Sequence, residues 1–186
     1  MKRNRLKNLR GRLSSVQVLA LGFGLLIFSG GALLTLPVFS RKQTFTPFID
    51  ALFTATSAVC VTGLTTVNTA LHWNEYGQLL IMLLIEIGGL GFITMTVMLY
   101  FILRKKITLR TRIVLREALN LEEMSGTFRL MMYVVKLAGV IQFIGALLLS
   151  FAFVPEFGWK KGIFYGIFHP ISSFCNAGFD LLGDSL

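Results

Sequence analysis

Long apolar stretches alternate with short polar ones along this chain, and the lengths of the apolar stretches predict membrane-spanning helices. Residues 16–38 carry no charged side chain over 23 positions. At about 1.5 Å per residue, such a helix crosses a hydrocarbon core of about 30 Å. Two further apolar runs, each interrupted by only one or two charged residues, cover residues 78–103 and 128–154. The pattern therefore predicts an all-α integral membrane protein with these three spanning helices.

A shorter and more polar stretch lies between the first two predicted spans. Thr46 suits an N-cap, Pro47 suits the first helical position, and Asp50 lies in the first turn, where the helix dipole favours an anion. We predict a short helix over about residues 47–58, which corresponds to about 17 Å, or half a membrane. We interpret residues 46–64 as a pore loop, which enters the membrane and returns to the same side.

Part of this stretch recurs 115 positions later in the chain. Residues 51–65 align with residues 166–180, and the alignment superposes Phe53 on Phe168, Ser57 on Ser172, Cys60 on Cys175 and Gly63 on Gly178. Each glycine alone would be interpreted as a helix terminator. A repeat that keeps a turn glycine and a small polar residue instead indicates one structural unit used twice. We therefore predict a second short helix and turn at residues 163–179.

The positive charges set the expected orientation. Of the 18 basic residues, six lie in the first 12 positions and seven lie between positions 104 and 129. Both clusters flank apolar runs and lack interleaved aromatic residues, which indicates cytoplasmic flanks rather than nucleic-acid binding. We expect a cytoplasmic arm at residues 1–15 and a cytoplasmic linker at 104–127, which lies on the membrane surface or contacts a cytosolic partner. The first apolar run is too long for a cleaved signal peptide.

The predicted topology favours a pore. The chain crosses the membrane twice between the two short helices, so both loops enter from the outer side. Inverted repeats require an odd number of crossings, so this chain has parallel helix–pore loop–helix repeats, as potassium channels do. A short helix that descends from outside points its negative end toward the membrane centre, where it favours a cation. The returning backbone can replace an ion's water with carbonyl groups, and Gly63 and Gly178 permit the backbone angles this needs.

Three stretches resemble the membrane subunits of Ktr/Trk-type potassium uptake systems: AVCVTGLTT at 58–66, IEIGGLGF at 85–92 and SSFCNAGFDL at 172–181. The resemblance covers essentially the whole chain, and the short basic arm before the first repeat is similar to the Ktr branch. It implies potassium translocation across the plasma membrane through the backbone carbonyls of a selectivity filter. The implied filter residues are Cys60, Val61, Thr62, Gly63, Leu64, Cys175, Asn176, Ala177, Gly178 and Phe179.

The resemblance also implies an assembly. It implies a homodimer and a cytosolic ring of nucleotide-binding regulatory subunits, with uptake that is often sodium-dependent and with no cofactor in this chain. Four repeats surround one pore in that family, whereas this chain covers one complete repeat at 16–103 and the start of a second at 128–186. We therefore expect a fragment of a longer chain.

Two functions of other classes remain as alternatives. A multi-spanning membrane enzyme would need a constellation of reactive side chains at one depth, and the sequence offers none that convinces. A non-transporting membrane scaffold would leave the repeated glycine turns unexplained. We therefore expect a transporter and not an enzyme.

Several ionisable residues lie in or beside the predicted spans. Glu86 and Lys136 each lie about 12 Å deep at the helical rise, where charged groups usually pair, so we predict an intramembrane pair. The alternative is that Lys136 extends toward the cytoplasmic surface. Asp180 either attracts cations at the outer mouth or is an exposed loop residue. His72 and His169 are interpreted as structural.

Glycines and cysteines complete the sequence pattern. The Gly-Gly-Leu-Gly run at 88–91 is interpreted as small-residue packing between membrane helices. Both cysteines fall inside the repeated motif, without a CxxC spacing or a neighbouring histidine, so neither a metal site nor a disulfide framework is indicated.

Overall fold

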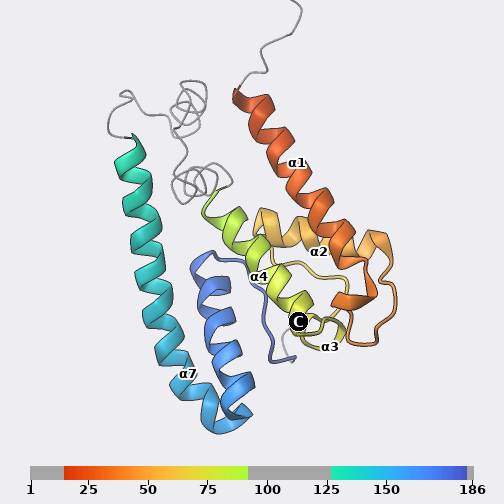
Figure 1. Ribbon diagram of the computed structural model, residues 1–186, viewed down its shortest axis with the longest axis vertical. Coiled ribbons are helices and arrows are strands. Elements are labelled where there is room, and N and C mark those ends of the chain that lie inside the picture. Colours follow the sequence, from red (N-terminus) through yellow and green to blue (C-terminus); the bar gives the residue numbers. More distant parts are fainter. Residues whose placement is uncertain (1–14, 92–126, 184–186) are drawn as a thin grey trace, which may run out of the picture.

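The computed structural model describes residues 15–91 and 127–183, and the main elements within these ranges are helices (Figure 1). They are α1 (Ser15–Leu34), η1 (Pro37–Phe39), α2 (Phe48–Cys60), α3 (Thr69–His72), α4 (Glu75–Gly89) and α7 (Thr127–Phe174). The prediction of an all-α fold is therefore confirmed for the described residues. Almost all of the predicted arm and linker, and the end of the second predicted span, lie outside them.

Helix α1 ends at Leu34 rather than at position 38, because the sequence beyond it cannot continue a helix. The hydroxyl of Thr35 donates to the carbonyl of Gly31 at 3.0 Å. A residue before proline is pushed toward extended backbone, and Leu36 has φ −70° and ψ 142°. Pro37 then begins the short helix η1. The first helix therefore ends before Pro37.

At the N-terminus of α2, the prediction that Thr46 is the N-cap is wrong. Thr46 does not cap the helix, because its Oγ1 lies 2.9 Å from Nε2 of His72 and is used in this contact with α3. The N-cap residue is Pro47, without a side-chain cap. Asp50 lies in the first turn, as predicted. The helix has 13 residues, or about 20 Å at the helical rise, which is still well short of a membrane.

Helix α7 consists of two arms joined at Gly158, where φ is 79° and ψ is 167°. Figure 1 shows the arms side by side and antiparallel. Small residues set their register: Gly162 faces Val154, Gly166 faces Ser150, and Gly145 faces Pro170. Glycines spaced four apart let helices approach closely. The first arm continues past Pro155, beyond its predicted end at position 154, so the connection is one sharp turn.

The buried core lies where α1, α2 and α4 pack together. Ile81 and Trp73 are fully buried in it. Close approach of α1 and α2 requires Gly31, because a Cβ there would lie 3.0 Å from Cα of Leu52. Phe168 of α7 belongs to the same core. The second short helix is therefore packed against the first repeat.

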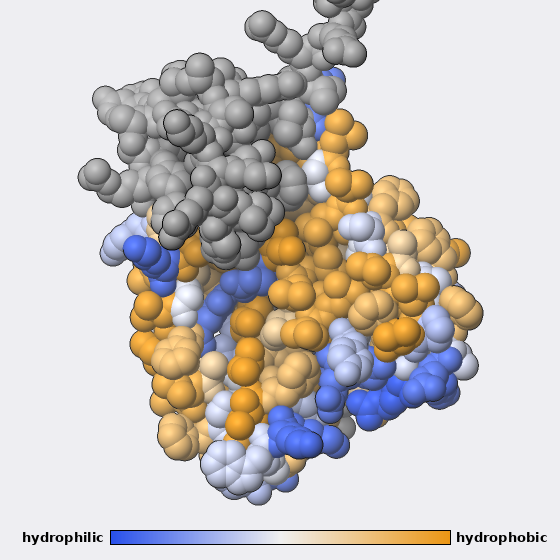
Figure 2. Space-filling view, in the orientation of Figure 1, coloured by the Kyte–Doolittle hydropathy of each residue, from blue (hydrophilic) through white to orange (hydrophobic). Residues whose placement is uncertain are grey.

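The surface carries large apolar areas. Apolar side chains cover much of the face in Figure 2, and polar ones gather toward its lower end. One described stretch, Met132–Phe174, is long and apolar enough to cross a membrane, while Leu19–Leu34 and Phe48–Cys60 are shorter apolar helices. Leu25 and Phe151 are 72% and 80% exposed. Such contiguous apolar faces fit contact with lipid or with further protein.

Candidate functional site

The first short helix ends in a tight turn that uses two residues with positive φ. Val61 has φ 58° and ψ 42°, and Gly63 has φ 77°. The backbone N–H groups of Val61 and Thr62 both donate to the carbonyl of Ser57, the second at 3.0 Å. The hydroxyl of Thr62 also donates to that of Ser57 at 2.9 Å. A β-branched residue is strained in the left-handed region, so the turn holds Val61 against its own preference.

The second short helix ends in the same way, 115 residues later. Asn176 has φ 58° and Gly178 has φ 71°, at the positions equivalent to the two residues above. The N–H of Ala177 donates to the carbonyl of Ser172 at 2.7 Å, which repeats the bond of the first turn. The sequence repeat is therefore matched by a repeat of backbone conformation. Asn adopts positive φ far more readily than a β-branched residue.

The two turns lie against each other. A Cβ on Gly63 would lie 2.9 Å from the carbonyl oxygen of Ala177 and 3.3 Å from Cα of Gly178. A Cβ on Gly178 would lie 3.2 Å from Cα of Gly63. Glycine is thus needed at both positions for its backbone angle and for space. Farther along, Nδ2 of Asn68 donates to the carbonyl of Gly183 at 3.1 Å. The structure therefore brings the two predicted filter segments together.

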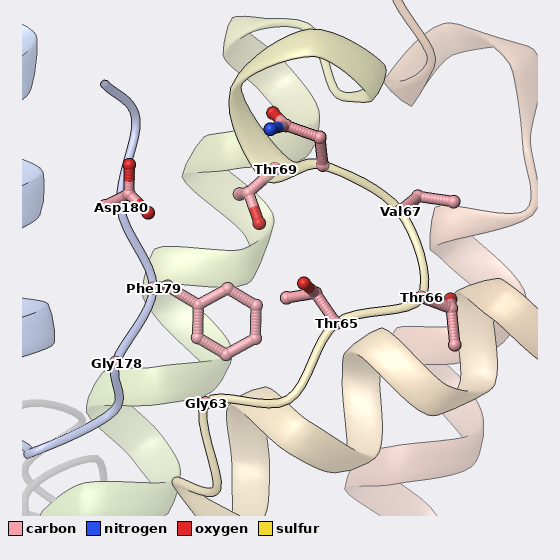
Figure 3. A pocket seen from close by; sticks show the side chains of 9 residues that line it. Gly63, Thr65, Thr66, Val67, Thr69, Gly178, Phe179 and Asp180 are labelled. Atoms are coloured by element: carbon pink, nitrogen blue, oxygen red, sulfur yellow. The ribbon is translucent and has the colours of Figure 1, made fainter. Parts of the chain in front are cut away.

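A cavity of about 330 Å³ opens beside the two glycines; it is lined by Gly63, Thr65, Thr66, Val67, Asn68, Thr69, Gly178, Phe179 and Asp180. Figure 3 shows the Phe179 ring projecting from the second loop toward Thr65 of the first. Asp180 supplies the carboxylate of this lining. Its Oδ1 also accepts the N–H groups of Leu182 at 2.9 Å and Gly183 at 3.2 Å. Asp180 therefore stabilises a turn while it faces the cavity.

The C-terminal end of α4 supports both turns. A Cβ on Gly88 would collide with the carbonyl of Val59, in the last turn of α2. A Cβ on Gly89 would lie 2.6 Å from Sγ of Cys175, at the start of the second loop. The interpretation of this glycine run as close packing is confirmed for these two positions. The structure adds that the packing partners are the two predicted filter segments.

Glu86, also on α4, contacts the second turn. Its Oε2 accepts a hydrogen bond from Nε2 of Gln142 at 2.9 Å and lies 3.7 Å from Sγ of Cys175. Within residues 15–91 and 127–183, no ion pair joins Glu86 to Lys136, so the predicted intramembrane pair is not formed. Lys136 lies six residues before Gln142 on α7, about 9 Å along the helix. Its side chain is exposed, which fits the alternative that it extends toward the surface.

The other predicted filter residues lie along the same two loops. Cys60 is exposed at the end of α2, and its thiol is free. Leu64 is 63% exposed. The carbonyl of Phe179 accepts a hydrogen bond from Oγ of Ser172 at 2.6 Å, so it is held toward the helix. Sequence reasoning missed Gln142, whose amide inside an apolar span was the available signal.

A helical chain with a membrane-length apolar stretch, and with two glycine turns paired at the ends of half-length helices, is typical of a membrane transport protein. Comparison with known protein families narrows this class. The model of the TrkH family, described as a cation transport protein, matches residues 18–186. The chain therefore belongs to the TrkH family of cation transport proteins.

Individual relatives agree with this assignment. The chain is 67% identical over 180 residues to the potassium/sodium uptake protein NtpJ of Enterococcus hirae, covering 97% of this chain and 40% of that protein. It is 46% identical over 175 residues to the Ktr system potassium uptake protein B of Bacillus subtilis, covering 94% and 39%. For the protein of the same name in Vibrio alginolyticus, the identity is 42% over 170 residues, covering 91% and 37%.

The chain thus spans about 40% of the length of the relatives it matches. Membership of the family confirms the resemblance found in the sequence. Because the family is one of transporters, it decides against the membrane enzyme and the non-transporting scaffold.

Proposed function

We propose that this chain forms part of the ion-translocating transmembrane subunit of a Ktr-type uptake system and carries potassium across the plasma membrane. The observation that carries the proposal is the contact between two equivalent glycine turns, with Gly63 against Gly178. In this proposal, residues 16–103 form one helix–pore loop–helix repeat and residues 128–186 begin a second, about one and a half of four repeats. Residues 1–15 and 104–127 then lie in the cytoplasm.

The ion-selecting groups in this proposal are backbone carbonyls of the loops at 60–64 and 175–179. Carbonyl rings select among alkali cations by cavity size and field strength, and both depend on backbone angles that a Cβ disturbs. The negative ends of the two short helices favour a cation near the turns. The carbonyl of Phe179 contributes least, because Ser172 already donates to it. The names of the relatives support potassium as the transported ion.

We further propose that the subunit works as a homodimer with a cytosolic nucleotide-binding regulatory subunit. The family resemblance and the relatives named as components of Ktr systems support this arrangement. Sodium is proposed as an activator or co-transported ion, because the E. hirae relative is named for both potassium and sodium.

Rubidium uptake tests the proposed function. The complete gene is expressed in a bacterium that lacks its own potassium uptake, as wild type and as Gly63→Ser. Gly24→Ser is the matched control, because a Cβ there meets nothing within 4 Å. We expect saturable uptake in the wild type and the control, and a raised KM for rubidium or entry of sodium with Gly63→Ser. If Gly63→Ser has the same rubidium uptake as the wild type at equal membrane abundance, the assignment of Gly63 to an ion-selecting filter is contradicted.

A further inference from the structure

Beyond its glycine, the second loop is tied back to its own short helix by two side chains. Oγ of Ser172 donates to the carbonyl of Phe179 at 2.6 Å. Nε2 of His169 lies 3.3 Å from the backbone nitrogen of Leu181. The two helix residues are three apart, so they lie on one face of the helix. That face therefore holds two successive stretches of the loop backbone.

The hydrogen-bond partners of His169 indicate which tautomer its ring adopts. Nδ1 lies 2.8 Å from the carbonyl oxygen of Tyr165, which can only accept, so Nδ1 carries a proton. Nε2 faces the N–H of Leu181, which can only donate, so Nε2 is the acceptor. The ring packs against aromatic neighbours, with centroids 5.3 Å from Phe153 and 5.8 Å from Phe168. The imidazole is thus an oriented acceptor for the N–H of Leu181.

The first repeat lacks this arrangement. Thr54 is the residue equivalent to His169, and its hydroxyl donates to the carbonyl of Asp50 in its own helix at 2.8 Å. Ser57, equivalent to Ser172, bonds the side chain of Thr62 instead of the loop backbone beyond Gly63. In the described part of the chain, the two repeats therefore share a turn but differ in how the following segment is held.

The hydrogen bond to His169 also orients the peptide group between Asp180 and Leu181. In a trans peptide, the N–H and the preceding C=O point in opposite directions. The bond from Leu181 to His169 directs that N–H toward the helix, so the carbonyl of Asp180 points away from it. Asp180 lines the cavity beside the two glycines. The hydrogen bond from Leu181 to His169 therefore turns the Asp180 carbonyl away from the helix, on a residue that lines the cavity.

We propose that His169 is a positioning residue that, through Leu181, holds the Asp180 carbonyl toward the cavity as an outer ligand for a partly hydrated alkali cation. This inference rests on the proposed function of the chain as part of a potassium pore. It assigns to the second repeat a contribution to ion affinity that the first repeat does not make. The imidazole does not touch the ion.

Two substitutions at position 169 separate this role from general packing. In His169→Gln the amide oxygen reaches the place of Nε2 and can accept from Leu181, whereas in His169→Asn the shorter side chain reaches only the place of Nδ1. Thr54→Val is the matched control in the first repeat, because it removes a bond internal to the helix. Uptake of rubidium is measured in the full-length transporter, with KM, maximal rate, competition by sodium and membrane abundance for each variant.

We expect His169→Gln and Thr54→Val to keep the wild-type KM, and His169→Asn to raise it about fivefold, the equivalent of one ordinary hydrogen bond. Equal KM values for the Gln and Asn variants would overturn the proposal. If His169→Asn fails to reach the membrane, His169→Thr copies the equivalent residue of the first repeat and removes the same bond to Leu181, and an unchanged KM there also overturns the proposal. Absence of uptake in the wild type would instead overturn the proposed function, so the two failures are distinguishable.

Discussion

Asn68 and Gly183 occupy equivalent positions in the two repeats, and the side chain of the first donates a hydrogen bond to the backbone of the second. The distance from Nδ2 to the carbonyl oxygen is 3.1 Å. Oδ1 of Asn68 also accepts from the N–H of Leu71 at 3.0 Å, which caps α3. Equivalent residues meet again at Gly63 and Gly178. The two loops therefore run alongside each other, and one asparagine stabilises both.

Replacing Asn68 by Asp separates its two bonds. The carboxylate can still accept from Leu71 but cannot donate to Gly183, so we expect the variant to lose about 1 kcal/mol of stability. Asn68→Ala should lose more, because the cap is also removed. The measurement is thermal unfolding of the purified full-length protein in detergent. Equal stability of wild type and Asn68→Asp would show that the contact between the loops contributes nothing.

Val61→Asn should stabilise the protein. The first turn places a β-branched residue at φ 58°, whereas the second turn uses Asn176 at the same angle. Relief of this strain is expected to add about 1 kcal/mol, visible as a raised unfolding temperature. The reverse exchange, Asn176→Val, is the control and should destabilise by a similar amount. The interpretation fails if the two exchanges shift stability in the same direction.

Glu86→Gln should preserve uptake, while Glu86→Leu should impair it. The described partners of the carboxylate are the neutral amide of Gln142 and the thiol of Cys175, so an acceptor is needed rather than a charge. The amide oxygen of Gln can accept the same bonds, and Leu cannot. Rubidium uptake at equal membrane abundance is the measurement. If Glu86→Gln fails as severely as Glu86→Leu, then the negative charge itself is required.

The partial burial of His72 should make stability depend on pH. Partial burial lowers the pKa of His72 below its ordinary value of 6.5; Asp50 opposes this shift and Lys42 adds to it. The unfolded chain then binds the proton more tightly, so stability is greatest above pH 6.5 and falls as the pH drops below it.

Unfolding temperatures between about pH 8 and about pH 5 measure this dependence across the range in which histidine titrates. Subtracting the profile of His72→Gln, which keeps a polar partner for Thr46 but does not titrate, isolates the contribution of His72. A wild-type profile parallel to that of His72→Gln would contradict the prediction.

Much of the fold could be predicted because its signals are local. These signals can be seen in the sequence without knowing any distant contact. They are the length of an apolar run, Pro37 after the first helix, and the recurrence of Gly63 as Gly178. The repeat also predicted that the two loops share a conformation. What it could not predict is that a second residue in each turn, Val61 or Asn176, adopts positive φ, because the sequence shows no glycine there.

The errors come from contacts between distant segments. Thr46 is a residue type that often caps helices, but its hydroxyl contacts the ring of His72 instead. Glu86 and Lys136 lie at suitable depths for a pair, yet depth does not specify which face of a helix a side chain occupies. In the structure, the carboxylate of Glu86 contacts the side chains of Gln142 and Cys175 instead of Lys136. Such choices are decided by packing, which a single sequence does not display.

Gly63 and Gly178 are proposed to serve one ion-selecting site, and a double-mutant cycle tests this most directly. Rubidium KM and sodium competition are measured for Gly63→Ala, Gly178→Ala and the double variant in the full-length transporter. Because each glycine lies within contact distance of the other, each single change should weaken discrimination, and the two effects should be non-additive. Normal discrimination in either single variant, or strictly additive effects, would contradict a shared site.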